Sequence, residues 1–279
     1  MASKGTKGTK GATMTGEKRT ALVTGASAGI GLELARLFAN DGHDVVLVAR
    51  GEAKLRALAA ELAQAGGATV HVIAADLGDR TTPERIIAEV RRLGIHVDFL
   101  VNNAGFGSNG AFLDLELSRE LEMIDVNVAA LVALTHHFAR PMRERGFGRV
   151  LNIGSTAGFQ PGPFMATYYA SKAFVISFTE ALAVELHGTG VSVTCYCPGA
   201  TATNFAAVAG NDKTRLFQRA GVADAKAVAR QAYRAMQRGK VLEVHGALNL
   251  AVMEALRVSP RSLARSIAAS LNRRPTPSA

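Results

Sequence analysis

The sequence predicts a single α/β domain built on a doubly wound parallel sheet. Short apolar runs typical of buried strands alternate along the chain with segments that repeat apolar residues at helical spacing. Such alternation favours parallel strands joined by helical crossovers. The 279 residues, 48% hydrophobic and 20% charged, are enough to bury one large core. Strands are predicted at 20–24, 43–50, 69–74, 97–101, 149–153 and 191–197, and helices at 32–41, 83–93, 118–145 and 167–187.

A glycine-rich turn separates the first predicted strand from the first predicted helix. Residues 25–31 read Gly-Ala-Ser-Ala-Gly-Ile-Gly. Glycines let the backbone approach a pyrophosphate, and the free N–H groups of a helix start attract its negative charge. The spacing differs from the common G-x-G-x-x-G dinucleotide fingerprint. A tight turn without a ligand is the alternative, but the flanking strand and helix favour a nucleotide site.

The second strand ends at Ala49 and Arg50. Sheets that bind NAD often carry an acid at this position, which bonds the ribose 2′-hydroxyl. Here no carboxylate would repel a 2′-phosphate, and the Arg50 guanidinium could bind one. NADP(H) is therefore favoured over NAD(H), with a solvated arginine at a strand end as the alternative.

The later strands also end in residues that carry chemistry. Gly25, Asp76, Asn103, Ser155 and Pro198 all lie just past predicted strand ends. Ligands of a doubly wound sheet bind at the carboxyl ends of its strands. We therefore expect these residues to converge on one edge of the sheet.

Tyr168 and Lys172 lie four residues apart on a predicted helix, so both side chains project from one face. A neighbouring ammonium favours phenolate, and we expect it to pull the pKa of Tyr168 from about 10 towards neutrality. The hydroxyl of Ser155 could orient a carbonyl against that phenol. The three residues predict a site that moves a proton on or off a carbonyl or alcohol oxygen.

Together these motifs resemble the short-chain dehydrogenases/reductases, an enzyme family with the Rossmann fold. The resemblance covers residues 18–245, and residues 102–107 with the Pro260-Arg261 tail look like a broad bacterial subgroup of assorted specificity. It implies an oxidoreductase that acts on CH–OH groups with NADP(H). The matching motifs are Thr24-Gly25-x-x-x-Gly29-x-Gly31, Asn102-Asn103-Ala104-Gly105, Ser155, Tyr168-x-x-x-Lys172 and Pro198-Gly199.

The resemblance also implies roles for the four catalytic positions. Tyr168 would be the general acid in reduction and the base in oxidation. Lys172 would lower the pKa of Tyr168 and bond the nicotinamide ribose, and Ser155 would hold the substrate oxygen. Asn127, on the long helix, would order a water that links Lys172 to solvent.

The same resemblance implies a cofactor site along the strand ends. Asp76 and Leu77 would border the adenine, Asn103 and Gly105 would pass beside the ribose, and Thr203 would bond the nicotinamide amide. The implied cofactor-binding residues are Gly25, Ser27, Gly29, Ile30, Gly31, Arg50, Asp76, Leu77, Asn103, Ala104, Gly105, Tyr168, Lys172, Pro198, Gly199, Thr201 and Thr203.

Several of these residues have plainer alternatives. Asn127 could merely bond backbone within its helix, and Asp76 could cap a helix. Thr156 could stand in for Ser155. Tyr169 lies three residues from the lysine and is predicted to pack.

No metal site is expected. His136 and His137 are adjacent on a helix and do not face the same way. Cys195 and Cys197 share one face of an extended strand, whose geometry disfavours a disulfide between them. Both are therefore expected as free thiols, which favours a reducing, cytoplasmic compartment.

The net charge of +9 is concentrated at the two ends of the chain. Residues 1–13 carry three lysines and residues 257–279 five arginines, with no acid in either segment, so residues 14–256 carry only +1. The chain also lacks a basic stripe with interleaved aromatic residues, so nucleic-acid binding is not expected.

These observations divide the chain into three parts. Residues 1–17 are expected to form a disordered basic tail, with Met14 as a candidate start of translation. Residues 18–246 form the catalytic domain, including a lid near 201–221. Residues 247–279 form a helical extension.

The helical extension begins with an apolar segment at 247–258, which is too short to span a bilayer. After it, Leu263, Ile267 and Leu271 recur every four residues and predict an amphipathic helix. We expect this helix to pack on the lid or on a partner subunit. Weak contact with an anionic membrane is the alternative.

Aromatic and apolar residues near the expected site favour an apolar carbonyl substrate over a sugar or a charged acid. A non-catalytic NADP(H)-sensing protein with the same fold is the alternative function. The resemblance further implies a homodimer or homotetramer packed through the helices near 118–145 and 167–187. The expected substrate-contacting residues are Phe106, Phe159, Phe164, Met165, Phe205 and Phe217.

Overall fold

A computed structural model describes residues 18–203, 205–210 and 222–273 of the chain. The predicted basic tail, most of the predicted lid, including Phe217, and the last six residues lie outside these ranges. In the described part, no helix has both the length and the apolar character needed to cross a membrane.

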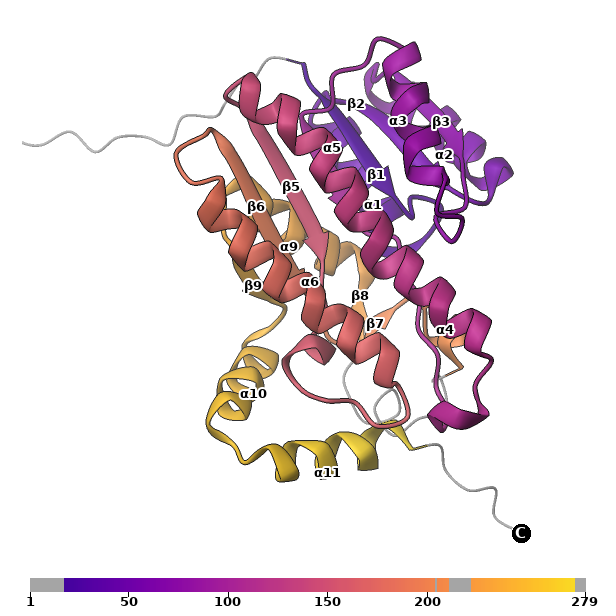
Figure 1. Cartoon of the computed structure of the whole chain (residues 1–279). Coiled ribbons are helices and arrows are strands. Elements are labelled where there is room, and N and C mark those ends of the chain that lie inside the picture. Colours follow the sequence, from indigo (N-terminus) through magenta and orange to yellow (C-terminus); the bar gives the residue numbers. More distant parts are fainter. Residues whose placement is uncertain (1–17, 204, 211–221, 274–279) are drawn as a thin grey trace, which may run out of the picture.

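The structure is organised around a seven-stranded sheet in which every pairing is parallel, in the order β3-β2-β1-β4-β5-β6-β9 (Figure 1). The chain moves outward from β1 through β2 to β3 and then returns to place β4 beside β1. This reversal opens a crevice at the carboxyl ends of β1 and β4. The strands are β1 (Thr20–Thr24), β2 (Asp44–Ala49), β3 (Val70–Ala74), β4 (Phe99–Asn102), β5 (Gly148–Ile153), β6 (Val191–Cys197) and β9 (Leu242–Val244), and β7 (Thr201–Ala202) pairs with β8 (Ala223–Asp224) in a small second sheet.

Helices cover both faces of the large sheet, as the alternating pattern predicts. Side chains of β1 alternate between the two cores: Ala21 and Val23 pack with α1, α2 and α9, whereas Leu22 packs with α3 and α5. The helices are α1 (Gly29–Asn40), α2 (Glu52–Gly66), α3 (Thr82–Arg92), α4 (Leu117–Ile124), α5 (Ala130–Glu144), α6 (Ala166–Glu185), α7 (Phe205–Ala209), α9 (Ala225–Gln237), α10 (Ala247–Val258) and α11 (Arg261–Asn272).

The long helix predicted at 118–145 is interrupted in the structure. A π-helical turn over residues 125–129 separates α4 from α5, and it contains Asn127. Such turns insert one extra residue into a helix and are frequent at functional sites. Figure 1 shows α10 and α11 beyond the carboxyl ends of β5 and β6, on the side of the crevice.

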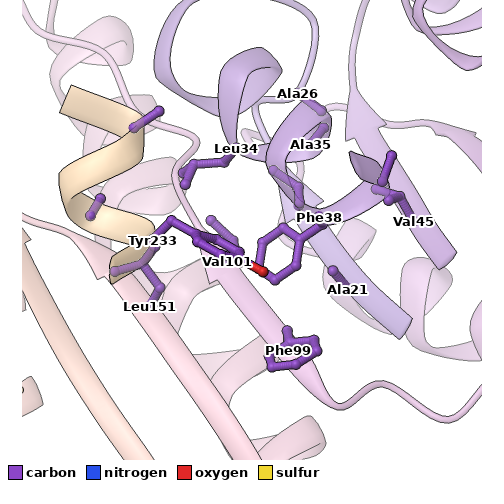
Figure 2. Packing of buried hydrophobic residues seen from close by; sticks show 14 of the residues in the cluster. Ala21, Ala26, Leu34, Ala35, Phe38, Val45, Phe99, Val101, Leu151 and Tyr233 are labelled. Atoms are coloured by element: carbon purple, nitrogen blue, oxygen red, sulfur yellow. The ribbon is translucent and has the colours of Figure 1, made fainter. Parts of the chain in front are cut away.

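The core under α1 is centred on an aromatic cluster (Figure 2). The ring of Phe38 lies 5.2 Å from that of Phe99 on β4 and 4.9 Å, edge-on, from that of Tyr233 on α9. The Tyr233 hydroxyl donates to Asp41 Oδ2 at 2.6 Å, just after α1 ends. This cluster fixes α1, and with it the glycine turn at the start of the helix, against the centre of the sheet.

Replacing Phe38 should show how far the fold depends on this cluster. Phe38→Ala removes a fully buried ring, and we expect the free energy of unfolding to fall by about 3–5 kcal/mol. Urea denaturation measures the change. Leu113→Ala, at a side chain that is 92% exposed, is the control and should alter stability by less than about 0.5 kcal/mol. Equal losses for the two variants would contradict the role given to the cluster.

Candidate active site

One continuous cavity of about 820 Å³ runs along the carboxyl ends of the central strands. Its lining comes from the loops after β1, β2, β3, β4, β5 and β6 and from the C-terminal helices. Segments far apart in sequence thus converge on one edge of the sheet, as expected. The candidate site residues that line it are Gly25, Ser27, Gly29, Ile30, Arg50, Asp76, Leu77, Asn103, Ala104, Gly105, Ser155, Tyr168, Lys172, Pro198, Gly199, Thr201 and Thr203.

The glycine turn forms the first end of this cavity. Gly25 and Gly29 have φ of 65° and 57°, a conformation that other residues rarely adopt. A Cβ on Gly29 would lie 2.8 Å from the methyl carbon of Thr203, so a side chain there would fill the cradle. Gly31 does not line the cavity. It packs inside against Asn103 and the carbonyl of Gly25, where a Cβ would collide with both.

Thr24 connects this turn to the loop after β4. Its hydroxyl accepts hydrogen bonds from the N–H groups of Asn103 and Ala104, both at 3.0 Å, and donates to the carbonyl of Val101 at 3.1 Å. The Asn103 amide in turn donates to the carbonyls of Thr24 and Gly25 at 2.9 and 3.3 Å. These contacts give Thr24 and Asn103 a clear structural role, which the motif alone did not reveal.

Around Arg50 the cavity carries charges of both signs. The guanidinium lies 3.9 Å from Asp76 Oδ2 and 3.8 Å from Glu122 Oε1, and its side chain is 67% exposed. Lys54 lines the same region. Glu122 comes from α4, and sequence analysis missed it because no motif connects that helix to the end of β2. The Arg50 cation is therefore present in the cavity, but two carboxylates compete for it.

Ser155, Tyr168 and Lys172 are buried together near the middle of the cavity. The Ser155 hydroxyl lies near enough to the Tyr168 phenol to lower its pKa, and it accepts from the N–H of Ala157 at 3.1 Å. The ammonium of Lys172 donates to the carbonyl of Ile153 at 2.8 Å and lies 5.9 Å from the centre of the Tyr168 ring. The structure thus brings the three predicted residues together in one cavity. Thr156 also lines the cavity.

Burial dominates the protonation of these groups. It raises the pKa of Tyr168 above its ordinary value, against a smaller lowering by the Ser155 hydrogen bond. Burial also lowers the pKa of Lys172 to about 8, opposed by the nearby thiols of Cys195 and Cys197. The direction of the Tyr168 pKa shift is opposite to the one expected from sequence, because desolvation is its largest cause. A buried neutral phenol is a proton donor.

Asn127 lies behind the cavity wall and does not line the cavity. Its Oδ1 accepts from the N–H of Phe106 at 3.1 Å, and its Nδ2 donates to the Phe106 carbonyl and to the Ser171 hydroxyl, both at 3.0 Å. A Cβ on Gly105 would lie 3.0 Å from Asn127 Oδ1 and 3.6 Å from Lys172 Nζ, so both groups flank that glycine. The plainer alternative, bonding to backbone, therefore describes the contacts of Asn127, although the backbone belongs to a different loop.

The part of the cavity lining that lies away from Arg50 and the glycine turn is uncharged, and we call this part the substrate end. Its residues, within the described part of the chain, are Phe106, Gln160, Met165, Tyr169, Phe205, Val208, Asn249, Val252, Met253 and Leu271.

Of the residues expected to contact substrate, Phe106, Met165 and Phe205 line this end. Phe159 instead packs in the core between α6 and α10, and Phe164 lies outside the lining. Sequence analysis missed Val252 and Met253, whose only signal was the apolar segment at 247–258.

Two further sequence features lie apart from this chemistry. No group of three metal-ligating side chains occurs among the described residues, which include His136 and His137. Cys195 and Cys197 are buried free thiols with sulfurs 3.7 Å apart. They pack beneath Gly154, where a Cβ would lie 2.8 Å from either sulfur.

Comparison with known proteins points to one family. The sequence model of the short chain dehydrogenases matches residues 19–214. A Streptomyces coelicolor protein named as a candidate ketoacyl reductase is 41% identical over 202 residues, which are 69% of this chain and 74% of that protein.

Solved structures are similar over most of the chain. A short-chain dehydrogenase from Sphingobium yanoikuyae in complex with NADPH has a TM-score of 0.77 and 33% identity, and the match covers 86% of this chain and 93% of that one. The bulky-bulky ketone specific alcohol dehydrogenase from Comamonas testosteroni has a TM-score of 0.73 and 30% identity, over 86% and 92% of the two chains.

The depressed pKa of Lys172 should be visible in the pH dependence of stability. Between pH 8 and 10.5 the folded chain holds fewer protons at this residue than the unfolded chain, so its contribution to stability rises with pH. Relative to Lys172→Met, we expect the free energy of unfolding of the parent to increase by up to about 1.4 kcal/mol per pH unit in this window. Denaturant titrations of both proteins at several pH values measure the difference. A difference that stays flat or falls would contradict it.

Proposed function

The chain belongs to the short-chain dehydrogenase family, and from this premise we propose that it is an NADP(H)-dependent oxidoreductase that interconverts an apolar ketone or aldehyde and its alcohol. The observation that carries the proposal is the joining of two features in one cavity. The glycine cradle lies at one end, and the buried Ser155, Tyr168 and Lys172 lie between it and the substrate end.

The chain's own residues supply binding, orientation and a proton. When bound, the nicotinamide supplies the hydride. Tyr168, neutral because it is buried, donates its proton to the carbonyl oxygen as that oxygen gains negative charge. The Ser155 hydroxyl, which lies near the phenol, holds the same oxygen. Lys172 would bond the cofactor ribose, and Asn127 holds the loop at Gly105 beside that ammonium.

The residues at the glycine turn fit a dinucleotide. A cradle that a Cβ would fill and the start of α1 suit a pyrophosphate. Asp76 and Leu77 would border the adenine, and Pro198, Gly199, Thr201 and Thr203 would border the nicotinamide.

The preference for NADP(H) rests on Arg50, which reaches the cavity at the end of β2. A 2′-phosphate there would compete with Asp76 and Glu122 for the guanidinium. The Sphingobium yanoikuyae relative, crystallised with NADPH, supports the same preference.

The substrate is proposed to be a neutral apolar carbonyl compound. The described residues of the substrate end carry no charge and supply only a few polar groups, such as Gln160 and Asn249. A similar enzyme from Comamonas testosteroni is specific for bulky-bulky ketones, which supports a ketone with large substituents.

A cytoplasmic homo-oligomer is the proposed form of the enzyme. A groove of about 550 Å³ between α5 and α6 has an apolar part, which includes Val132, Phe178 and Leu182, and polar or charged residues such as Arg140, Arg143 and Glu185. Val184 on α6 is largely exposed. These apolar groups suit a second copy of the chain, packed through the helices expected from sequence.

Loss of the phenolic hydroxyl should remove turnover without removing the cofactor. Tyr168→Phe keeps the ring and deletes the proton donor, so we expect kcat to fall by about 10²–10⁴-fold. NADPH consumption with a panel of apolar ketones and aldehydes measures kcat, and fluorescence titration measures NADPH affinity. Tyr196→Phe makes the same change at a buried tyrosine of β6, outside the cavity lining, and is the control. Undiminished turnover in Tyr168→Phe would exclude the proposed chemistry. NADPH binding without turnover in the parent would favour the sensing alternative.

Cofactor preference should depend on Arg50. Arg50→Ala removes the only arginine that lines the cavity among the described residues, and we expect Kd for NADPH to rise about tenfold or more, with little change for NADH. Glu122→Gln frees the guanidinium from one carboxylate and should tighten NADPH. Arg56→Ala, on the exposed side of α2, is the matched control. Equal effects of Arg50→Ala on both cofactors would refute the assignment of Arg50 to the 2′-phosphate.

A further inference from the structure

The last helix, α11, forms part of the wall of the substrate end. Its buried residues are Ala264, Ala268 and Asn272, spaced every four residues, and Leu271 lines the cavity. Leu263 and Ile267, which the sequence pattern placed on the packed face, are instead 52% and 46% exposed. The helix is therefore docked through small residues, which allow its backbone to approach closely, and its C-terminal turn is the part that reaches the cavity.

Asn272 fastens that turn to three other segments. Its side-chain Oδ1 accepts from the Tyr169 hydroxyl at 3.1 Å, and its Nδ2 donates to the Pro163 carbonyl at 3.1 Å. Its backbone carbonyl accepts from Asn109 Nδ2 at 2.9 Å. Asn272 is only 1% exposed, and the side chains of Tyr169 and Asn109 are also buried. Hydrogen bonds among buried groups fix a geometry because leaving any one of them unpaired is costly.

The three segments held by Asn272 are those that build the substrate end. Asn109 follows Phe106 in the loop after β4, and Pro163 precedes Met165 at the start of α6. Tyr169 is next to Tyr168, with ring centres 6.1 Å apart. The position of Leu271 is thus defined relative to the proton donor.

Helix α10 completes the same wall. Val252 and Met253 line the same cavity as Leu271, and Asn249 reaches the backbone near Gly199, where a Cβ would lie 2.8 Å from its Nδ2. The C-terminal helices therefore contribute apolar surface to the substrate end and no charged lining residue among those described.

We propose that Leu271 determines the size of the substrate group that the enzyme accepts, and that Asn272, through Tyr169, is the positioning residue that holds Leu271 in place. The proposal rests on the proposed function and deepens it. The favoured ligand is a neutral ketone whose bulky apolar substituent packs against Leu271, Val252 and Met253. A small ketone leaves this wall without contact.

The first test enlarges the side chain at the wall. Leu271→Trp should weaken benzophenone binding, measured by titration calorimetry with NADP⁺ present, and should raise its KM in NADPH-dependent turnover. We expect both the Kd and the KM for benzophenone to rise about tenfold or more, since pocket mismatches of a methylene or larger have effects of that size. Turnover of acetone should change little. Leu263→Trp, on the exposed face of the same helix, is the matched control and should leave all of these values at those of the parent.

The second test separates positioning from mere stability. Tyr169→Phe and Asn272→Ala each break the hydrogen bond between the two side chains, so both should raise KM for benzophenone, and the double variant should add little to the single ones. Thermal melting of each variant reports the loss of stability. A purely structural role would lower the melting temperature and reduce kcat for benzophenone and acetone alike, with additive effects.

The outcomes distinguish this proposal from the proposed function. If benzophenone binding weakens in Leu271→Trp but the parent shows no turnover, the proposed reductase activity is wrong and the proposed role of Leu271 stands. If the parent turns over benzophenone but Leu271→Trp and Leu263→Trp change its Kd and KM equally, the reductase activity stands and the proposed role of Leu271 is wrong. Absence of both binding and turnover with benzophenone, or turnover confined to small or charged aldehydes, would overturn the assignment of a bulky apolar ligand.

Discussion

The hydroxyl of Thr24 joins the two central strands at the point where the strand order reverses. By donating to Val101 of β4 and accepting from two N–H groups of the loop after it, this one hydroxyl completes the backbone hydrogen bonding that the diverging strands leave open. The glycine turn and the loop at residues 103–105 are consequently held in one arrangement. The relative positions of the residues along the cavity, from Arg50 to Lys172, therefore depend on this junction.

Burial shifts the pKa values of Tyr168 and Lys172 and also opposes folding. Burial makes the charged forms of both groups, the Lys172 ammonium and the Tyr168 phenolate, less stable than they are in water, which is why the two pKa values move in opposite directions. The fold tolerates this because Lys172 bonds the Ile153 carbonyl and Tyr168 stays neutral. Packing in the two cores of the sheet offsets the free-energy cost of burying these groups.

The sequence predicted the position of a residue well where that residue directly follows a strand. The parallel sheet and the resemblance to the short-chain dehydrogenases were predicted and are confirmed. The structure also gathers the glycine turn and Ser155, Tyr168 and Lys172 in one cavity. Features that depend on contacts between distant segments were not predicted. Glu122 reaches Arg50 only through tertiary packing, and α11 docks through small residues that lack the usual apolar signal. Helix α2, rich in alanine, likewise gave too weak a periodic pattern.

The contacts of Asn272 span between 103 and 163 residues of sequence, whereas Thr24 bonds residues 77 to 80 positions away within adjacent strands. Closing the longer loops costs more chain entropy, and fewer neighbouring interactions support them. On warming, the end of α11 is therefore expected to separate from the domain before the central sheet melts. The enzyme would then lose its discrimination between large and small ketones at temperatures where the cofactor half is still folded.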